Sequence, residues 1–291
     1  MVKDEATMEG KIRWDESTHE HKVTKFYAHG VENFDDFHGG YLNFGLWEDG
    51  NKDYLTAAET LVKRLGEMLN LNDESHLLDV ACGMGGQDVV LASNFPLKKI
   101  TAFDLMFEHL EHARKRIEKA GLMHKIETRQ GTATKLPFSE NTFTHILCIE
   151  GIVHFDTREK FFLECNRVLR ESGRVVFSDY VAKKVPSNRL ETFILKLVTK
   201  VWNIPFENVD TPERYKRKLE ASGFRDVVVH CVGEKVIPGY CEEQNRQECI
   251  AELVRIRGFF AGRIGHVIDH ILEWAYNKGL IDYVLVEANK K

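Results

Sequence analysis

Short apolar runs alternate with longer amphipathic segments through the middle of the chain. Five runs have the length and flanking residues of buried strands, and they lie near residues 76–82, 99–104, 125–130, 144–150 and 174–180. The segments between them carry apolar residues at helical spacing, as from Met106 to Ala120, after which Gly121 ends the predicted helix. This alternation predicts a parallel sheet with helices on both of its faces.

The segment before the first predicted strand shows a different pattern. A polar stretch comes first, and Thr56 to Leu69 then has the apolar spacing of a helix that packs under the sheet. We therefore predict a helical N-terminal cap over residues 1–75 and a core over residues 76–291.

The pattern changes again after Tyr180. The elements predicted there are helices from Asn188 to Trp202, from the Thr211 cap to Gly223 and from Cys241 to Tyr276, and strands over Phe224 to Val232 and Ile281 to Glu287. The long third helix should break near Gly258 or Gly262. Insertions near residues 182–210 and 240–278 are predicted to roof the site as lids.

Composition and charge exclude several classes of protein. Of the 291 residues, 43% are hydrophobic and 29% are charged, which is ordinary for a soluble globular protein. The net charge of -5 provides no basic field for nucleic acid, and no apolar run approaches the roughly 18 residues of a membrane helix. The chain begins without the apolar core of a signal peptide, and its six cysteines form no C-x-x-C pair. We expect a cytoplasmic protein with reduced thiols, no nucleic-acid or membrane partner, and a homodimer as an open alternative.

The segment from Leu77 to Gln87 combines a strand, a glycine-rich turn and the start of a helix. Gly83, Gly85 and Gly86 let the backbone turn with no side chain in the way. Such a turn exposes backbone N–H groups above the carboxyl end of a strand, which is where open α/β sheets bind nucleotides.

Three carboxylates near this turn decide between classes of ligand. A dinucleotide fingerprint has the pattern Gly-x-Gly-x-x-Gly, and its last position here is Asp88, while Asp79 lies inside the strand. These two acids disfavour a pyrophosphate and favour a cationic amino group, which argues for a nucleoside that carries an amino acid rather than for NAD. Asp104 ends the next predicted strand, about 20 residues past the first glycine, where a carboxylate can accept both ribose hydroxyls. The alternative is that Asp104 caps the following helix.

Four segments in order resemble motifs of the class I S-adenosylmethionine-dependent methyltransferases. Asp79 to Gly86 is similar to their motif I, and Asp104 stands where their ribose-binding acid stands. Leu136 to Phe143 is similar to the LPF-x-x-x-x-F segment before their fourth strand. Glu164 to Arg174 resembles their E-x-x-R-V-L-x-x-G-G-R helix and turn. The resemblance covers roughly residues 75–181 and points to the small-molecule, natural-product O-methyltransferase branch.

The resemblance implies a fold and a cofactor. The fold is α/β, a doubly wound, seven-stranded, mostly parallel Rossmann-like sheet whose last strand is antiparallel, with a helical N-terminal cap and helical insertions. The cofactor is S-adenosyl-L-methionine, and the residues implied to bind it are Asp79, Ala81, Gly83, Gly85, Gln87, Asp104, Leu105, Met106, Thr132, Ala133 and Ile149. Thr132 departs from the family pattern, because it replaces the Asp of the usual Gly-Asp-Ala segment that binds the adenine amino group.

Methyl transfer from a sulfonium is an in-line displacement, which for a hydroxyl acceptor also needs a base. His154 lies just past the carboxyl end of the fourth predicted strand, and an imidazole with a pKa of about 6.5 suits this task. Asp179, at the end of the fifth strand, is predicted to orient that imidazole, since the family's small-molecule O-methyltransferases carry a His and an acid at these places. Glu150 is predicted to contact the methionine amino group or the substrate. The alternative is that His154 and Asp179 cap their elements and Glu150 merely lines the cleft.

Aromatic and histidine residues outside these motifs are the candidates for the substrate site. They are Tyr27, Tyr41, Phe44, Trp47, Trp202 and His266, with packing as the alternative for most of them. His109 and His112 share a helix face with two glutamates and are predicted to lie on a solvated surface. His266 and His270 have metal-ligand spacing, but we predict no metal site.

The predicted function is methyl transfer from S-adenosylmethionine to a small-molecule acceptor, a hydroxyl oxygen in the first instance, with His154 as general base. The absence of an Asn/Asp-Pro-Pro segment after the fourth strand argues against nucleic-acid bases and protein amides as acceptors. Transfer to nitrogen or carbon, an NAD-dependent oxidoreductase and a non-catalytic cofactor-binding protein remain as alternatives. Asp79 and Asp88 argue against the oxidoreductase, and the intact set of Asp79, Asp104 and His154 argues against the non-catalytic protein.

Overall fold

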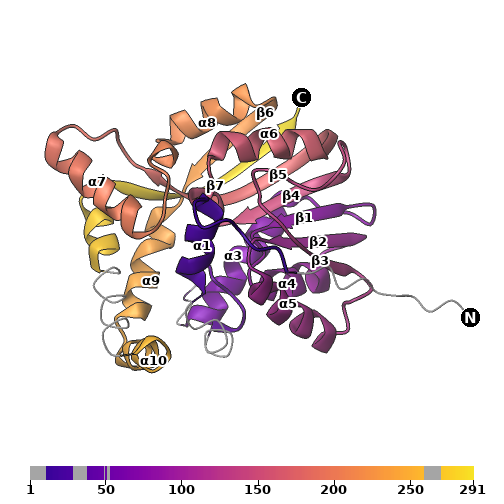
Figure 1. Ribbon diagram of the computed structural model, residues 1–291, viewed down its shortest axis with the longest axis horizontal. Coiled ribbons are helices and arrows are strands. Elements are labelled where there is room, and N and C mark those ends of the chain that lie inside the picture. Colours follow the sequence, from indigo (N-terminus) through magenta and orange to yellow (C-terminus); the bar gives the residue numbers. More distant parts are fainter. Residues whose placement is uncertain (1–10, 29–37, 49, 51–52, 259–269) are drawn as a thin grey trace, which may run out of the picture.

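A seven-stranded sheet forms the centre of the computed structural model, which describes residues 11–28, 38–48, 50, 53–258 and 270–291. The strands are β1 (His76–Val80), β2 (Lys99–Asp104), β3 (Ile126–Gln130), β4 (Phe143–Ile149), β5 (Leu169–Ala182), β6 (Phe224–Cys231) and β7 (Ile281–Lys290). Their order is β3-β2-β1-β4-β5-β7-β6. The first five strands are parallel, and β7 is antiparallel to β5 and to β6 (Figure 1). The predicted doubly wound, mostly parallel fold is therefore confirmed.

Helices cover both faces of the sheet (Figure 1). The helices α3 (Tyr54–Leu69), α4 (Gly86–Asn94) and α5 (Phe107–Lys119) pack on one face, and α6 (Arg158–Val168) and α8 (Pro212–Ala221) on the other. Alternate strand residues enter two separate cores, as Leu77 and Leu78 do in β1. Because both faces are buried, the strands read as continuous apolar runs, which is the pattern that the sequence shows.

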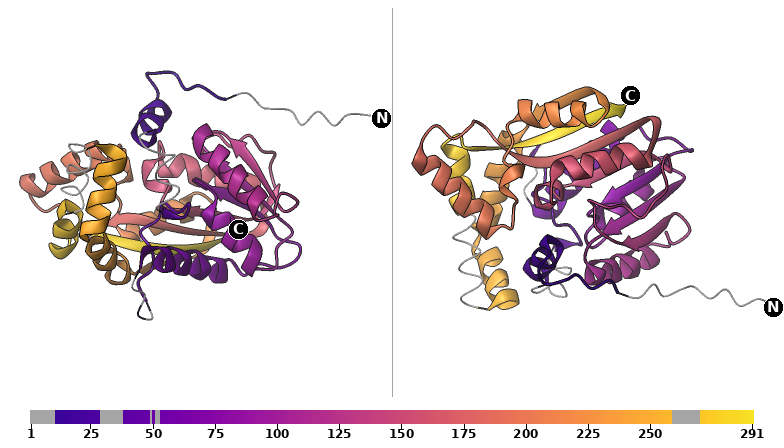
Figure 2. Two further views of the ribbon diagram at one scale, coloured as in Figure 1. Left: turned by 90° about the horizontal axis from the view of Figure 1, so that it is seen from below. Right: turned by 45° about the horizontal axis from the view of Figure 1, so that its top comes forward.

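The remaining helices lie beyond the carboxyl ends of the parallel strands. They are α1 (His19–Tyr27), α7 (Arg189–Val201), α9 (Ile237–Gln244), α10 (Gln247–Arg257), a helix over 270–277 and the short 3-10 turns η1 (Ile152–His154), η2 (Phe206–Asn208) and η3 (Gly233–Lys235). Figure 2 shows α1 outside the layers formed by the sheet and its covering helices. From this position α1 contacts residues at the carboxyl ends of the strands, as described below.

Most predicted elements agree with the structure, and two differ. The strand predicted near residues 174–180 begins at Leu169, because Leu169 pairs with Phe143 before a register shift in the ladder between β4 and β5. The long helix predicted from Cys241 begins earlier and breaks at Arg246, whose extended backbone separates α9 from α10. Gly258 then ends α10 with a positive φ, which is the break predicted there.

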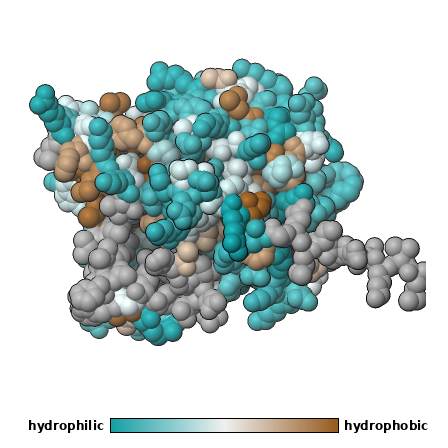
Figure 3. Space-filling view, in the orientation of Figure 1, coloured by the Kyte–Doolittle hydropathy of each residue, from teal (hydrophilic) through white to brown (hydrophobic). Residues whose placement is uncertain are grey.

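The surface is mainly hydrophilic, with an apolar exception over α7 (Figure 3). Phe193 and Leu197, one helical turn apart, are exposed on that helix. Among the helices of the described residues, none has the length and apolar content needed to cross a membrane. Five of the six cysteines are buried, and Cys231 is exposed.

Candidate active site

The candidate site lies at the carboxyl ends of β1 and β4, where the strand order of the sheet reverses. The glycine-rich turn leaves β1 at this point, and Glu150 and His154 follow β4. Neighbouring crossovers run to opposite sides of the sheet here, which is the place where open α/β sheets bind their ligands. The topology therefore brings together the two predicted halves of the site.

The glycine-rich turn requires glycine for conformational and for steric reasons. Gly83 and Gly85 have φ values of 57° and 78°, in the left-handed region. A Cβ at Gly85 would lie 2.9 Å from the Cβ of Ala113 in α5. A Cβ at Gly86 would lie 2.8 Å from the carbonyl oxygen of Gly40, because the segment around Gly40 packs directly on the turn. The turn is thus held between α5 and the head of the chain.

Asp104 is buried beside this turn at the end of β2. Its Oδ2 accepts a hydrogen bond from Gly83 N (2.9 Å), and its Oδ1 accepts one from Met106 N (2.8 Å). An ionised carboxylate has about four acceptor positions, so two remain for a ribose diol. The contact with Met106 N, at the start of α5, means that the capping role and the ribose role are compatible.

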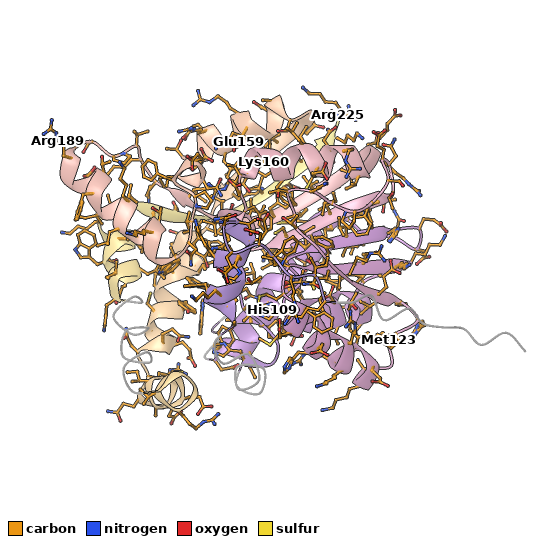
Figure 4. The ribbon with its side chains drawn as sticks, viewed as in Figure 1. His109, Met123, Glu159, Lys160, Arg189 and Arg225 are labelled. Carbon is orange, nitrogen blue, oxygen red and sulfur yellow. The ribbon has the colours of Figure 1, made fainter. Side chains whose placement is uncertain are left out.

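His109 corrects one expectation of the sequence analysis. It is 4% exposed, and its Nδ1 lies 3.4 Å from Asp104 Oδ1. Figure 4 shows His109 in the interior of the molecule, whereas Arg189 and Arg225 point outward at its edges. The first turn of α5 places His109 on the inward side of the helix, next to the candidate ribose acid and not on a solvated surface.

Asp79 is fully buried at the end of β1. Its Oδ2 accepts a hydrogen bond from Gln87 Nε2 (2.7 Å), and its Oδ1 has no hydrogen-bond partner among the described residues. Burial raises the pKa of Asp79 to about 7. A buried carboxylate oxygen without a partner is a suitable acceptor for a cationic amino group.

The helix α1 crosses the site and contacts both of its halves. Thr132 Oγ1 donates to Glu20 Oε1 (3.0 Å), and His19 Nε2 donates to the carbonyl oxygen of His154 (2.7 Å). The Tyr27 hydroxyl is hydrogen-bonded to His154 Nε2 at 3.0 Å. The head of the chain therefore covers the segment predicted for adenine and the predicted base together.

His154 is partly buried at the end of the turn η1. Burial lowers the pKa of its imidazole to about 4, so the ring is neutral at physiological pH and can accept a proton. Its Nδ1 has no hydrogen-bond partner among the described residues. The ring is therefore restrained at Nε2 by Tyr27.

Asp179 pairs with Arg158 and not with His154, which corrects the predicted His–Asp contact. Asp179 and Arg158 are both fully buried, and Arg158 Nε donates to Asp179 Oδ2 at 2.9 Å. Burial raises the pKa of Asp179, and the adjacent guanidinium opposes that rise. A fully buried cation is stable only when it is paired, and Arg158 takes the carboxylate of Asp179 for this purpose.

The same arginine reaches the His154 turn through Asn208. Arg158 N donates to Asn208 Oδ1 (3.0 Å), and Arg158 Nη1 donates to the carbonyl oxygen of Asn208. Asn208 Nδ2 in turn donates to the carbonyl oxygens of Val153 (2.9 Å) and Phe155 (2.7 Å), which flank His154. Asp179 thus acts on His154 indirectly, by holding the arginine that anchors this turn.

Glu150 accepts hydrogen bonds from three donors. They are Phe44 N (2.8 Å) and the Tyr283 hydroxyl (2.8 Å) on Oε1, and the Tyr180 hydroxyl on Oε2. Tyr180 and Tyr283 are register partners on β5 and β7. Burial raises the pKa of Glu150 to about 7. The carboxylate therefore ties the head of the chain to two strands.

Aromatic rings surround this carboxylate. Phe44 stacks on Tyr240 with ring centroids 3.7 Å apart, and it meets Tyr180 edge-on at 5.0 Å. Trp202 and Tyr283 meet Tyr180 edge-on at 6.4 Å and 5.2 Å. Phe44 and Trp202, both predicted substrate residues, thus lie together beside Glu150.

The other predicted residues have varied surroundings. Tyr41 is 8% exposed and belongs to the hydrophobic core, so it packs and does not form part of a lid. Trp47 Nε1 donates to the backbone carbonyl oxygen of Phe44 (2.9 Å), so the indole is tied to the backbone of that residue. Met106, Ala133 and Ile149 are buried near the turn, and Leu105 and Ala81 are partly buried. His266 lies outside the described residues, and no cluster suited to a metal ion occurs within them.

Several residues of the site were missed by the sequence analysis. They are Glu20, His109, Arg158, Asn208, Tyr240 and Tyr283. Apart from His109, which lies five residues from Asp104, each belongs to an element remote in sequence from the residue that it contacts. One signal was available in the sequence: His109 lies on the same face of α5 as the apolar residues Ala113 and Ile117, which indicates a buried histidine.

A comparison with known protein families identifies the central part of this site. Residues 78–177 match the family model described as a methyltransferase domain. The chain carries an S-adenosylmethionine-dependent methyltransferase domain. The matched residues run from β1 to β5, so they include Asp79, Asp104 and His154.

Relatives of the methyltransferase domain differ in the acceptor that their names give. Erythromycin 3''-O-methyltransferase of Saccharopolyspora erythraea is 28% identical over 210 residues, which cover 68% of this chain and 66% of that protein. The O-methyltransferase cnsE of Penicillium expansum is 24% identical over 271 residues, or 92% of each protein. The solved geranyl diphosphate C-methyltransferase of Streptomyces coelicolor A3(2), which contains S-adenosyl-L-homocysteine, has a TM-score of 0.73 at 15% identity and covers 96% of this chain and 100% of its own. That structural likeness shows the fold alone.

The residues of the methyltransferase domain fit S-adenosylmethionine. The cofactor combines a cationic amino group with a ribose diol, and the site offers a buried unpartnered oxygen on Asp79 for the first. Asp104 retains acceptor positions for the second. The small residues of the turn allow close approach of the backbone. S-adenosylmethionine is accordingly the cofactor of this domain.

Proposed function

We propose that this protein transfers a methyl group from S-adenosylmethionine to a hydroxyl oxygen of a small molecule, with His154 as general base. The observation that carries the proposal is the hydroxyl of Tyr27 on His154 Nε2 at 3.0 Å. In this contact an aromatic hydroxyl lies at hydrogen-bond distance from the imidazole, which supports the proposal. An acceptor hydroxyl in the position of the Tyr27 hydroxyl would meet the same nitrogen.

The residues around the site support a small, partly apolar acceptor. Phe44, Tyr180, Trp202 and Tyr240 provide aromatic surface on the side of Glu150. Sites for small molecules combine apolar and aromatic walls with a few polar groups that orient the ligand. Glu150 and His154 would be those polar groups. The names of the O-methylating relatives favour the same type of acceptor.

When bound, the cofactor would supply a methyl group on a positively charged sulfur; the acceptor oxygen would bond to the methyl carbon while the carbon–sulfur bond breaks and the neutral thioether leaves. Asp79 and Asp104 would hold its methionine and ribose ends, and the α1 helix would exclude water from above. His154 would take the acceptor proton on Nε2, and Asn208 would keep its turn in place. The residues of this chain would therefore align the acceptor with the methyl group, exclude water from the site and accept the proton.

Glu150 is a second candidate for the base. Its pKa of about 7 lies closer to a neutral working pH than the pKa of about 4 of His154. Against this role, Phe44 N and the hydroxyls of Tyr180 and Tyr283 already occupy its carboxylate. We therefore assign Glu150 to positioning the aromatic wall. The alternative reaction is methyl transfer to nitrogen or carbon, which does not require His154 to remove a proton from a hydroxyl.

Calorimetric titration with S-adenosylhomocysteine, and with NADH as control, tests the ligand class directly. Binding of the first ligand alone is the expected result, because Asp79 and Asp88 repel a pyrophosphate. Transfer of labelled methyl to a panel of hydroxyl, amine and carbon acceptors then tests the reaction. Labelling confined to amines or carbon would contradict the hydroxyl proposal, and absence of any labelling would favour a non-catalytic protein.

Replacement of Asp104 by asparagine is expected to weaken S-adenosylhomocysteine binding by about 100-fold. A hydrogen bond to a charged group contributes about 1.5–3 kcal/mol, and two such bonds to the ribose would lose their charge assistance. Calorimetry measures the change. Asp73 is exposed just before β1, at the amino ends of the parallel strands, so Asp73→Asn is the matched control. An affinity of Asp104→Asn within threefold of the wild type would contradict the assignment.

Glu20 is expected to supply the carboxylate that the Gly-Thr-Ala segment lacks. It accepts a hydrogen bond from Thr132, at the position assigned to the adenine amino group by resemblance. We expect Glu20→Gln to weaken S-adenosylhomocysteine binding about fivefold, in line with the loss of one partly solvated charge-assisted contact. Exposed Glu16, in the same segment, gives the control Glu16→Gln. Equal affinities of Glu20→Gln and Glu16→Gln for S-adenosylhomocysteine would contradict this assignment.

A further inference from the structure

The outer side of α7 carries large apolar side chains where a surface helix usually carries polar ones. The inner side of this helix packs through Leu195 and Thr199, which are buried. On the outer side, Phe193 is 63% exposed and Leu197 is 52% exposed, one helical turn further along. Val185, in the loop that leads into α7, is exposed as well. Large apolar side chains that lie next to one another in water indicate an interaction surface.

Cations accompany these apolar side chains on the same side of the helix. Arg189, Lys196 and Lys200 each lie three or four residues from Phe193 or Leu197, which is the spacing of neighbours on one helix face. We call this surface the α7 face, and its residues are Arg189, Phe193, Lys196, Leu197 and Lys200. None of its three cations forms an ion pair with a described residue. Figure 4 shows Arg189 pointing away from the molecule at the end of α7.

The acid of α7 does not neutralise these cations. Glu191 is the one carboxylate in the sequence of this helix, and two residues from Arg189 it lies on another side. It accepts hydrogen bonds from Ser187 N (2.7 Å) and Lys184 Nζ (3.0 Å). The backbone N–H of Ser187 and the Lys184 ammonium lower the pKa of Glu191 to about 2, so it stays ionised and paired. The α7 face therefore has a local positive charge in a chain whose net charge is -5.

More apolar surface lies at the same end of the molecule. The views agree that the helix over 270–277 lies beside α7 (Figures 1 and 2). Ile271 and Trp274, three residues apart in this helix, are both exposed. Phe206 is exposed too, and Lys196 Nζ lies 5.4 Å from the centroid of its ring. Tryptophan favours the boundary between water and lipid, because its ring is apolar and its N–H is polar.

We propose that the α7 face docks on the surface of a membrane that contains anionic lipids. Phe193 and Leu197 enter the boundary between the lipid headgroups and the acyl chains, and the three cations meet the lipid phosphates. A helix of this kind lies in the plane of the membrane surface and does not cross it. The lack of an apolar run of spanning length, from which the sequence analysis expected no membrane partner, therefore does not argue against this contact.

The charge of the α7 face selects lipid over a second copy of this chain. A two-fold contact places the same surface on both partners, so Arg189, Lys196 and Lys200 of one copy would approach the cations of the other. Like charges that face each other across an interface oppose association. Anionic headgroups turn the same three charges into an attraction.

Binding of the full chain to lipid vesicles tests the docking, and it needs neither cofactor nor acceptor, so its outcome is independent of the proposed methyl transfer. Sedimentation compares vesicles of equal parts phosphatidylcholine and phosphatidylglycerol with vesicles of phosphatidylcholine alone. A cation near an anionic surface strengthens binding about fivefold, so three cations should make binding to the mixed vesicles about 100-fold tighter. Added salt should weaken that binding, because it screens the charges. Equal binding to the two kinds of vesicle would overturn the proposal.

Two double variants separate the apolar contribution from the charged one. Phe193→Gln with Leu197→Gln should weaken binding to the mixed vesicles about tenfold and leave its dependence on salt unchanged. Lys196→Gln with Lys200→Gln should weaken the same binding about 25-fold and reduce its dependence on salt. Glutamine is a good helix former, so α7 itself should persist in both variants.

Matched controls lie on helices at other faces of the molecule. Lys216→Gln with Arg217→Gln removes two exposed cations from α8, and Leu163→Gln removes an exposed apolar side chain from α6. These variants should bind the mixed vesicles as the wild type does. Losses as large as those of the α7 variants would mean that total charge and hydrophobicity govern binding, and the assignment to the α7 face would fall.

Sedimentation velocity without lipid examines the second copy as the occupant. A dimer of the wild type that dissociates in Phe193→Gln with Leu197→Gln would assign the α7 face to self-association and overturn the proposal. Should that variant fail to fold, as judged by circular dichroism, the variant Lys196→Gln with Lys200→Gln decides by itself. Binding of this charge variant to the mixed vesicles at the wild-type level would equally overturn the proposal.

Discussion

Replacement of His154 by alanine is expected to lower kcat about 100-fold or more, while the affinity for S-adenosylhomocysteine stays within about threefold. The reason is that His154 would act on the acceptor proton, whereas the cofactor contacts come from β1, β2 and the glycine-rich turn. Initial rates with a hydroxyl acceptor and calorimetry of the same preparation measure the two effects. His124→Ala is the matched control, because His124 is exposed just before β3, at the amino ends of the parallel strands and away from the site.

The pH profile decides between the two candidate bases. With a pKa of about 4, His154 is deprotonated throughout pH 5 to 9, so kcat/KM should be flat over that range if His154 is the base. With a pKa of about 7, Glu150 would lose its basic form below neutral pH, and kcat/KM would fall about tenfold for each unit below 7. A fall of this kind that persists in His154→Ala would transfer the role of base to Glu150.

Replacement of Arg158 by methionine is expected to lower the free energy of unfolding by about 3–5 kcal/mol. Asp179 is fully buried and pairs with Arg158 at 2.9 Å, so removal of the guanidinium leaves this buried carboxylate without its cation. Asp210, which also pairs with Arg158, keeps its ion pairs with Lys218 and Arg214. Denaturant unfolding followed by tryptophan fluorescence measures the change. Lys160→Met in the same helix is the control, because the Lys160 side chain is exposed.

The loss in Arg158→Met should depend on pH. Without the guanidinium, the pKa of Asp179 should rise further, since burial already raises it and Arg158 opposes that rise. An acid whose folded pKa lies above its unfolded value costs stability at high pH, and the cost shrinks as the pH falls through the folded value. The difference from the wild type should therefore narrow between pH 8 and pH 5. A loss that is small, or independent of pH, would mean that Asp179 is neutral in the folded wild type.

The network around Arg158 also changes the predicted role of Asp179. A histidine after β4 and an acid at the end of β5 suggested a direct pair, but the acid meets the arginine and the arginine meets Asn208. Asn208 then holds the carbonyl groups on either side of His154. Substitutions at Asp179 should thus act on stability first and on the pH profile of turnover only through the position of the turn.

The turn, the strands and most helices could be predicted because their signals are local. Left-handed φ values at Gly83 and Gly85 require glycine, and apolar runs of strand length mark the buried strands. Thr211 does cap α8 and accept a hydrogen bond from Arg214 N, as its position before Pro212 predicted. Such features depend on residues within one turn or one strand, so they can be recognised in the sequence alone.

The partners of the buried polar groups could not be predicted in the same way. His109 was expected on a surface and lies beside Asp104, and Tyr41 was expected in a lid and lies in the core. Glu150 is held by residues that are 106 and 133 positions away in the chain. A charged group or hydroxyl that is buried away from water needs a hydrogen-bonding partner. The sequence contains several residues that could serve, so it does not indicate which one does.

The sequence by itself determined the sheet, the glycine-rich turn and the carboxylates at the ends of β1 and β2, because strand periodicity and backbone sterics act between near neighbours. The tertiary structure alone decided that Asp179 pairs with Arg158, that α1 brings Tyr27 to His154, and that Glu150 gathers the aromatic rings. These pairings depend on which elements pack together and on which partner then lies within hydrogen-bonding distance of a desolvated group. They arise from the summed burial of remote segments, which no local pattern encodes.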